Sequence, residues 1–213
     1  MAYLVKELFY TLQGEGARSG RASVFCRFAG CNLWSGREED RSRAACYFCD
    51  TDFVGSDGPG GGRFQAPDDL ADAILRQWPA RGEVPPLHAY VVFTGGEPLL
   101  QLDGALIEAC HRRGFEVAVE TNGTIRAPQG VDWLTVSPKP HSTLVQRQGS
   151  ELKLVFPHEV RPEEVEHLDF LHFYLQPMDG PRRTENTRLA IAYCHAHPQW
   201  KLGLQIHKFI GIP

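Results

Sequence analysis

The second half of the chain alternates short apolar runs with helical or polar segments, and this alternation restricts the fold more than any other feature. The run AYVVFT at 89–94 is almost wholly apolar, as in a strand that is covered on both faces. Similar runs predict further strands, and helical spacing of apolar residues predicts helices at 99–113 and 184–197. The predicted strands lie at 89–94, 115–120, 131–136, 151–156, 170–176 and 200–207.

Strands that alternate with helices or crossover segments favour a parallel sheet of the α/β class. Several connections, such as 123–130, are too short for a full helix, so the helical layer should be incomplete. A closed barrel of eight β/α units needs about 250 residues, whereas this chain has 213. We therefore expect an open, partial (β/α) barrel of parallel strands with a reduced helical layer.

The N-terminal part of the chain is less regular. Residues 3–10 predict a strand or turn, and the alternation in 23–29 predicts a strand. The glycine-rich stretch 55–62 predicts a flexible, exposed loop. A helix is expected from Pro67, which suits a first helical turn, to about Trp78. Pro79, Pro85 and Pro86 indicate a loop beyond that helix.

Polar or glycine-rich motifs directly follow five of the predicted strands. In parallel α/β folds, ligands bind at the carboxyl ends of strands. A series of such motifs therefore indicates a ligand site more strongly than it indicates unrelated turns, helix caps or surface charges. The motifs are Thr94-Gly95-Gly96-Glu97-Pro98, Glu120-Thr121-Asn122-Gly123, Ser137-Pro138-Lys139, Gln176-Pro177-Met178-Asp179 and His207-Lys208.

Two N-terminal features are candidates for the same site. In the stretch 11–16, two glycines flank Glu15, which suits a loop whose backbone approaches a ligand, although a surface hairpin explains this loop alone better. Arg27 lies on the strand face opposite Cys26 and Phe28. An arginine at a strand end can bind a carboxylate through both arms, but an isolated one is more often a solvated edge residue.

Three of the six cysteines form a triple: fourteen residues separate Cys31 from Cys46, and two separate Cys46 from Cys49. A C-x-x-C turn can hold two thiolates on one metal or cluster, and Cys31 would supply a third. Clusters with four cysteine ligands are saturated, whereas three ligands leave one iron open to bind a small molecule. The charge run GREEDRSR in the first gap predicts a solvated loop or short helix. The other cysteines, Cys26, Cys110 and Cys194, lie in apolar segments and favour buried packing roles.

Composition limits the class of protein. The net charge of −4, with no basic run, argues against a nucleic-acid partner. The first ten residues lack the apolar core of a signal peptide, and no apolar run is long enough to span a bilayer. We therefore expect a cytoplasmic protein with reduced cysteines and no membrane partner.

The cysteine triple, followed by a strand that ends in Gly-Gly-Glu-Pro, resembles the radical S-adenosylmethionine (SAM) superfamily. The usual spacing there is C-x-x-x-C-x-x-C, so the longer first gap is a departure. That gap, with Gln13-Gly14-Glu15-Gly16 upstream and Asp50-Thr51 after Cys49, resembles the 7-carboxy-7-deazaguanine synthase family. The segment from Gln205 to Pro213 is also similar to that family, so the resemblance covers nearly the whole chain.

The resemblance implies a reaction and its cofactors. A 4Fe–4S cluster binds SAM through its amino and carboxylate groups, and one electron cleaves SAM to a 5′-deoxyadenosyl radical. The radical takes a hydrogen from C6 of 6-carboxy-5,6,7,8-tetrahydropterin; the ring contracts, ammonia leaves and 7-carboxy-7-deazaguanine forms, a step toward queuosine. SAM is regenerated and magnesium assists. The resemblance further implies an electron donor such as a flavodoxin or ferredoxin, a homodimer, and one radical SAM domain over 1–213 with a cluster-binding insertion around 31–62.

The resemblance also implies roles for individual residues, with no catalytic side chain because the radical is generated on SAM. Cys31, Cys46 and Cys49 hold the cluster, and Thr51, a hard oxygen donor, is a magnesium ligand. The implied substrate contacts are Leu12, Gln13, Gly14, Arg27, Thr94 and Pro213, with Arg27 on the substrate carboxylate and Pro213 acting through its terminal carboxylate. The implied SAM contacts are Phe48, Cys49, Asp50, Gly96, Ser137, Pro138, Lys139, Gln176, Pro177, Met178 and Asp179. No firm role follows for Glu15, Glu120, Asn122 or His207.

Three alternatives remain open from the sequence. A glycyl-radical-enzyme activating protein shares a compact partial barrel, but normally keeps the shorter cysteine gap. A zinc-binding structural module needs four ligands around one ion, with Cys26 or a histidine as the fourth. An iron–sulfur electron carrier would lack the Gly-Gly-Glu-Pro loop and any affinity for SAM.

Overall fold

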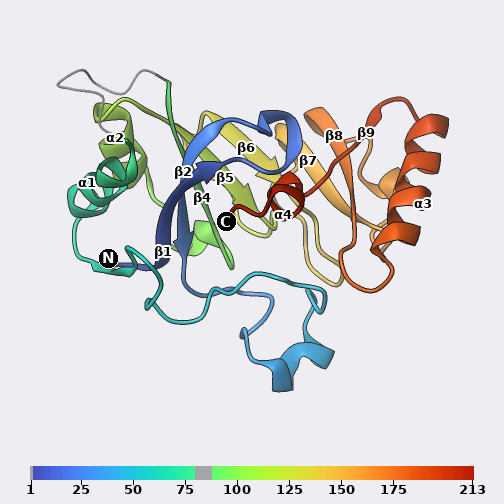
Figure 1. The fold of residues 1–213 in the computed structure, drawn as a ribbon, viewed down its shortest axis with the longest axis horizontal. Helices are drawn as coiled ribbons and strands as arrows, with labels where there is room; N and C mark the ends of the chain where they lie inside the picture. Colours follow the sequence, from blue (N-terminus) through green and yellow to red (C-terminus); the bar gives the residue numbers. More distant parts are fainter. Residues whose placement is uncertain (1, 80–87) are drawn as a thin grey trace.

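The computed structural model describes residues 2–79 and 88–213, so the loop predicted at Pro85 and Pro86 lies outside the described residues. Its centre is one nine-stranded sheet with the strand order β3-β1-β2-β4-β5-β6-β7-β8-β9 (Figure 1). The strands are β1 (Tyr3–Leu12), β2 (Ala22–Phe28), β3 (Gly62–Phe64), β4 (Ala89–Gly95), β5 (Phe115–Thr121), β6 (Trp133–Val136), β7 (Gln148–Phe156), β8 (Asp169–Pro177) and β9 (Trp200–Leu202).

The strands from β2 to β9, β3 excepted, are all parallel to one another, and the sheet stays open. This confirms the predicted open α/β architecture. The N-terminal edge differs from the prediction, because β1 runs antiparallel to both β2 and β3. The reason is local: the β1–β2 connection folds back on itself, with the amide of Gln13 donating to the carbonyl of Arg21 at 2.8 Å. Such a short connection joins antiparallel neighbours only.

The α-helices are α1 (Pro67–Gln77), α2 (Gly104–Arg112), α3 (Arg183–Ala196) and α4 (Ile206–Ile210). Figure 1 shows α1 and α2 together over one end of the sheet and α3 beside β8 and β9 at the other end. No α-helix lies in the connections 122–132 and 137–147, between β5, β6 and β7, all of which are described. The predicted reduction of the helical layer is therefore confirmed.

The two faces of the central strands differ in character. Residues Val91, Phe93, Val117 and Val119 point into the main apolar core beneath the helices. The alternate positions on the other face form a small apolar cluster of Tyr90, Val92 and Ala118 with Phe25 and Trp133. Farther along the same face, toward the strand ends, the side chains become polar. Side-chain alternation thus separates a packed outer face from an inner face that is free to bind a ligand.

The glycine-rich stretch 55–62 is mostly the exposed loop that was predicted, but it makes defined contacts that the sequence did not suggest. It follows β1 closely: Gly58 donates to the carbonyl of Lys6 at 3.0 Å, and the carbonyl of Pro59 accepts from Leu8 at 2.8 Å. A Cβ atom on Gly61 would stand 2.2 Å from the Lys6 carbonyl oxygen. The glycines therefore permit the chain to lie against the backbone of β1 before it enters β3.

Two predicted elements differ most from the structure. The predicted helix 99–113 is a single 3-10 turn (Pro98–Leu100) followed by α2, which begins where Asp103 caps the amide of Leu106 at 3.0 Å. The predicted strand 200–207 ends at Leu202, so His207 and Lys208 do not follow a strand. The chain turns instead to donate from Ile206 to the carbonyl of Gly14 at 2.9 Å, and it forms α4 there.

In the two described ranges, no helix has the length and apolar content that crossing a membrane would require.

Candidate active site

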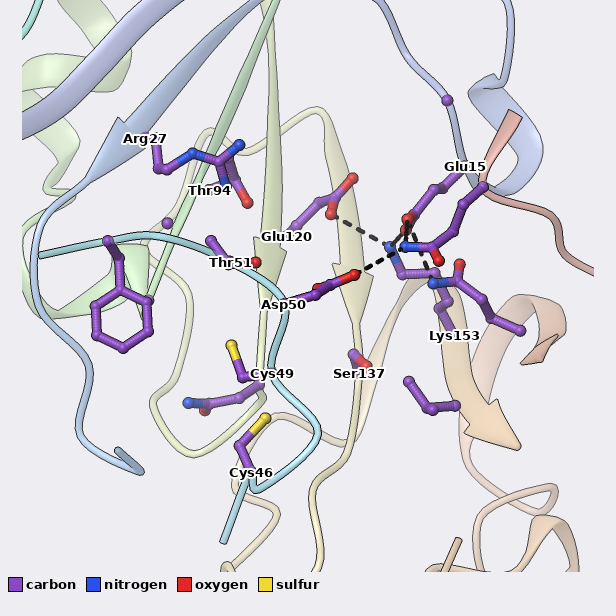
Figure 2. Close-up of a pocket in the computed structure, with 18 of the residues that line it drawn as sticks. Glu15, Arg27, Cys46, Cys49, Asp50, Thr51, Thr94, Glu120, Ser137 and Lys153 are labelled. Atoms are coloured by element: carbon purple, nitrogen blue, oxygen red, sulfur yellow. Dashed lines mark hydrogen bonds and ion pairs between the residues drawn. The ribbon is translucent and has the colours of Figure 1, made fainter. Parts of the chain in front are cut away.

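A cavity of 360 Å³ opens at the carboxyl ends of the parallel strands and collects nearly all of the residues singled out in the sequence. Its volume is in the range typical of small-molecule and cofactor sites. Figure 2 shows the Cys46 and Cys49 side chains on one side and Glu15 and Lys153 on another, with Asp50 between them and Thr51 nearer Thr94. The predicted residues that line it are Leu12, Gln13, Gly14, Arg27, Cys31, Cys46, Phe48, Cys49, Asp50, Thr51, Thr94, Gly96, Ser137, Lys139, Gln176, Pro177, Met178, Asp179 and Pro213.

Pro138 is the exception among the predicted site residues: it is buried and does not line the cavity, although Ser137 and Lys139 on either side do. The residues without an assigned role, Glu15, Glu120, Asn122 and His207, also line the wall. His207 reaches the site from α4, where its ring lies against Gly14; a Cβ atom there would be 2.2 Å from the ring nitrogen Nδ1.

The Gly-Gly-Glu-Pro motif packs directly against the loop that carries Cys31. A Cβ atom on Gly96 would lie 2.2 Å from the carbonyl oxygen of Gly30 and 2.6 Å from the Cys31 Cβ. The amide of Glu97 donates to the same Gly30 carbonyl at 3.1 Å. Because only glycine fits this approach, Gly96 sets the position of Cys31 relative to the end of β4.

Glu97 is fully buried and connects the ends of two strands. Its carboxylate accepts from the amide of Leu99 at 3.0 Å, the hydroxyl of Thr121 at 2.8 Å and the amide of Asn122 at 2.8 Å. Burial raises the pKa of Glu97, against these hydrogen bonds. The role that the geometry gives this glutamate is therefore structural: it connects the loop after β4 to the loop after β5.

Cys46 and Cys49 form the expected turn, in which the amide of Cys49 donates to the carbonyl of Cys46 at 3.0 Å. The hydrogen bond from the Cys46 thiol lowers the pKa of Cys49, whereas burial raises the pKa of Cys31. Cys49 is thus the thiol of the three that ionises most readily, and thiolates are the form that binds metals.

The three thiols suit a cluster better than a single ion. Among residues 2–79 and 88–213, no three His, Cys, Asp or Glu side chains converge closely enough to hold one metal ion. A structural zinc site would need four such ligands around one ion. An iron–sulfur cluster takes each cysteine on a different iron, so three thiols that line one cavity fit it.

Opposite the cysteines lies a buried charge network that the sequence did not reveal. The Lys153 ammonium contacts the Glu15 carboxylate and donates to Glu120 at 3.2 Å (Figure 2). Burial lowers the pKa of Lys153, but the Glu120 and Glu15 carboxylates outweigh it and leave the pKa raised. Gln13 donates to Glu120 at 2.9 Å, and Gln205 donates to Glu15 at 3.0 Å. The sequence did offer one signal: Lys153 is the lone charged residue in the otherwise apolar run LKLVF, which suggests a lysine with a specific partner.

Arg27 and Thr94 are neighbours in register on β2 and β4, and both line the cavity (Figure 2). Arg27 donates from Nε to the Glu7 carboxylate at 2.7 Å, and its side chain is 20% exposed. Glu7, also missed in the sequence, fixes the arginine while the two terminal nitrogens stay available for a forked pair with a carboxylate.

The C-terminal segment crosses the mouth of the site. Lys208 in α4 donates at 2.6 Å to Asp50 and at 2.6 Å to Asp179. The hydroxyl of Thr11 donates to the Pro213 oxygen at 3.0 Å, which places the chain terminus beside β1. On the far wall, Lys139 donates to the hydroxyl of Ser137 at 2.6 Å. Burial lowers the pKa of Lys139.

Comparison with known proteins identifies the relatives of this chain. It is 64% identical to 7-carboxy-7-deazaguanine synthase of Bordetella pertussis and 63% identical to the enzyme of that name from Bradyrhizobium diazoefficiens; each alignment covers 100% of both chains. The crystal structure of QueE from Escherichia coli superposes with a TM-score of 0.69 at 27% identity, covering 97% of this chain and 95% of that one. No family model matches the sequence. Full-length identity at this level shows that the chain belongs to the 7-carboxy-7-deazaguanine synthase family.

Proposed function

We propose that this chain converts 6-carboxy-5,6,7,8-tetrahydropterin to 7-carboxy-7-deazaguanine, with loss of ammonia, as a radical SAM enzyme of queuosine biosynthesis. One observation carries the assignment of the site. The cysteine triple with its expanded first gap lines the same cavity as Arg27, Thr94 and the chain terminus at Pro213. A cluster, a SAM molecule and a carboxylated substrate would therefore meet in one enclosure.

In this proposal Cys31, Cys46 and Cys49 hold the 4Fe–4S cluster and leave one iron open for SAM. When bound, the cluster and SAM supply the radical that takes hydrogen from the substrate. The protein binds, orients and shields these groups. Two groups of residues would receive SAM: Phe48, Cys49 and Asp50 at the cysteine turn, and Gly96, Ser137, Lys139 and Gln176 to Asp179 at the strand ends. Support comes from the charges on this wall, because the half-buried Lys139 ammonium suits the SAM carboxylate.

On the substrate side, Arg27 would pair with the pterin carboxylate, held in place by Glu7 at 2.7 Å. Leu12, Gln13, Gly14, Thr94 and the Pro213 carboxylate would complete the substrate wall. The Lys153 network supports this arrangement, because Lys153 contacts the carboxylates of Glu15 and Glu120, and Glu120 also accepts from Gln13. Those carboxylates face a substrate ring that is rich in N–H donors.

We also propose that Thr51 is the protein ligand of a magnesium ion. Its hydroxyl lies on the cavity wall next to Asp50. Magnesium prefers oxygen ligands and retains several waters, so one protein oxygen and the substrate carboxylate suffice to place it. Substrate binding and magnesium binding should therefore be coupled.

Several properties of the whole protein belong to the same proposal: one domain over 1–213 with a cluster-binding insertion around 31–62, a homodimer, and a cytoplasmic location. The location is supported by the six cysteines, which are all free thiols. An external reductant such as a flavodoxin or ferredoxin is required, because the reaction needs one electron.

Anaerobic turnover tests the proposal. The cluster is reconstituted, and SAM, dithionite, magnesium and 6-carboxytetrahydropterin are supplied; mass spectrometry should detect 7-carboxy-7-deazaguanine only when all are present. Cleavage of SAM without that product would reject the substrate and favour the activating-enzyme alternative. A colourless protein that binds no iron would reject the radical SAM assignment itself.

A further inference from the structure

The fourteen residues between Cys31 and Cys46 form more than a solvent-exposed loop. It contains a 3-10 helix (Glu38–Arg43) that lies apart from the sheet in Figure 1. One of its arginines differs from the others in burial. The Arg41 side chain is 31% exposed, compared with 73% for Arg37, and Arg43 is exposed. Arg41 therefore points back into the protein.

All three guanidinium nitrogens of Arg41 are used. Nη1 donates to the carbonyl of Tyr47 at 2.8 Å and to the carbonyl of Cys49 at 2.9 Å. Nε and Nη2 donate to the two oxygens of Glu38 at 2.7 and 2.6 Å. This forked geometry is specific to arginine, because a lysine ammonium is a point charge on a flexible stem.

The guanidinium rests on a buried support. Its carbon lies 4.2 Å from the centre of the Trp34 ring. Trp34 is 7% exposed and packs edge-on against Phe53 at 5.6 Å, and its indole donates to the carbonyl of Arg37 at 3.1 Å. A rigid aromatic base, reached from both ends of the insertion, thus fixes the arginine in space.

We propose that Arg41 is a positioning residue that pre-forms the Cys46–Cys49 turn and places a positive charge beside the bound cluster. The inference rests on the proposed function, because it takes Cys46 and Cys49 as cluster ligands. By holding the Tyr47 and Cys49 carbonyls, Arg41 fixes the backbone on both sides of Phe48 before the cluster arrives. The long gap between Cys31 and Cys46 then has a function, because it contains the arginine that holds the turn. The three-residue gap of the usual C-x-x-x-C spacing is too short to contain such a residue and its support.

The turn is tested first in the cluster-free protein, by hydrogen exchange of residues 46–51. Arg41→Gln should increase exchange in this segment about tenfold, which corresponds to about 1.4 kcal/mol of lost protection. Arg43→Gln is the matched control: it makes the same charge change on the same 3-10 helix and should leave exchange unchanged. Equal exchange in the two variants would overturn the proposal without touching the proposed function.

The cluster-loaded protein separates the clamp from the charge. Arg41→Lys keeps the charge but loses the fork, so it should release iron to a chelator about tenfold faster while keeping the wild-type reduction potential. Arg41→Gln should do both: release iron faster and shift the potential to a more negative value, because a nearby cation favours the reduced cluster. If Arg41→Gln fails to fold, Glu38→Gln weakens the same clamp and should move iron release in the same direction.

The outcomes distinguish a failure of the proposed function from a failure of the Arg41 inference. Wild-type protein that takes up no cluster would reject the proposed function and this inference together. A wild-type cluster with iron release and potential unchanged in Arg41→Gln relative to Arg43→Gln would reject the inference alone.

Discussion

Replacing Lys153 with methionine tests the charge network on the substrate wall. The Lys153 side chain is 8% exposed, and its partners Glu15 and Glu120 are 13% and 22% exposed. At the 3.2 Å separation from Glu120, Coulomb attraction amounts to about 5 kcal/mol at an effective dielectric constant of about 20. Desolvation offsets much of that attraction. Removing the cation leaves two half-buried carboxylates without their ammonium partner, a change that costs up to about 3–5 kcal/mol.

The free energy of unfolding that Lys153→Met loses should depend on pH. The pKa shifts decide whether the loss grows or shrinks as the pH rises. In the wild type, burial raises the pKa of Glu15 but Lys153 outweighs it and lowers the pKa below its ordinary value. That stabilisation is fully present above the unfolded pKa of about 4.3 and is lost only as the pH falls. Without Lys153, burial and the second carboxylate raise the folded pKa. The folded variant then binds a proton that the unfolded chain releases, and its stability falls as the pH rises.

Urea unfolding followed by circular dichroism at pH 5.5 and pH 7.5 measures both the loss of stability and its dependence on pH. The free energy lost by Lys153→Met should be about 1–2 kcal/mol larger at pH 7.5, because each proton contributes up to about 1.4 kcal/mol per pH unit. Lys201→Met, an exposed lysine on β9, should change stability by less than about 0.5 kcal/mol. Adding Glu120→Gln to Lys153→Met should recover part of the loss. A loss below about 1 kcal/mol, or the same loss at both pH values, would refute the reasoning.

Three other predictions follow from the site geometry. Gly96→Ala would press its Cβ against the Cys31 loop, costing about 1–3 kcal/mol and lowering the iron bound on reconstitution; Gly104→Ala, whose Cβ meets nothing within 4 Å, should bind iron normally. Glu97→Gln points an amide at three donors, so urea unfolding should show a loss of about 1–3 kcal/mol, and full stability would mean that the network is dispensable. Arg27→Gln should raise KM for the pterin at least about tenfold, about 1.4 kcal/mol of binding, while SAM cleavage persists; an unchanged KM would remove Arg27 from the substrate site.

Much of the parallel sheet was predictable because the central strands are short runs rich in apolar residues, of which β4 is the most continuous. The positions of the polar strand ends followed from that pattern, since parallel strands end at the same edge. The cavity accordingly collects Thr94, Glu120, Ser137 and Gln176, which lie far apart in the sequence. Helical spacing likewise located α1 and α3 to within a residue or two.

Other features depend on contacts between distant segments, which no local pattern encodes. The path of 55–62 is set by hydrogen bonds to β1, and α4 replaces a strand because Ile206 bonds to Gly14. Lys153 gains its partners only when β7 lies opposite the Glu15 loop. Arg41 looked like one charge in a solvated run, because its support, Trp34 and the Cys46–Cys49 turn, comes from both ends of the insertion.

The most direct test of the account is product formation by cysteine variants under anaerobic turnover. Cys31→Ala, Cys46→Ala and Cys49→Ala should each abolish 7-carboxy-7-deazaguanine formation and reduce bound iron. Cys194→Ala, on α3 and outside the cavity lining, should retain both. Product at the wild-type rate from any variant of the triple, or its loss in Cys194→Ala alone, would contradict the assignment of the site.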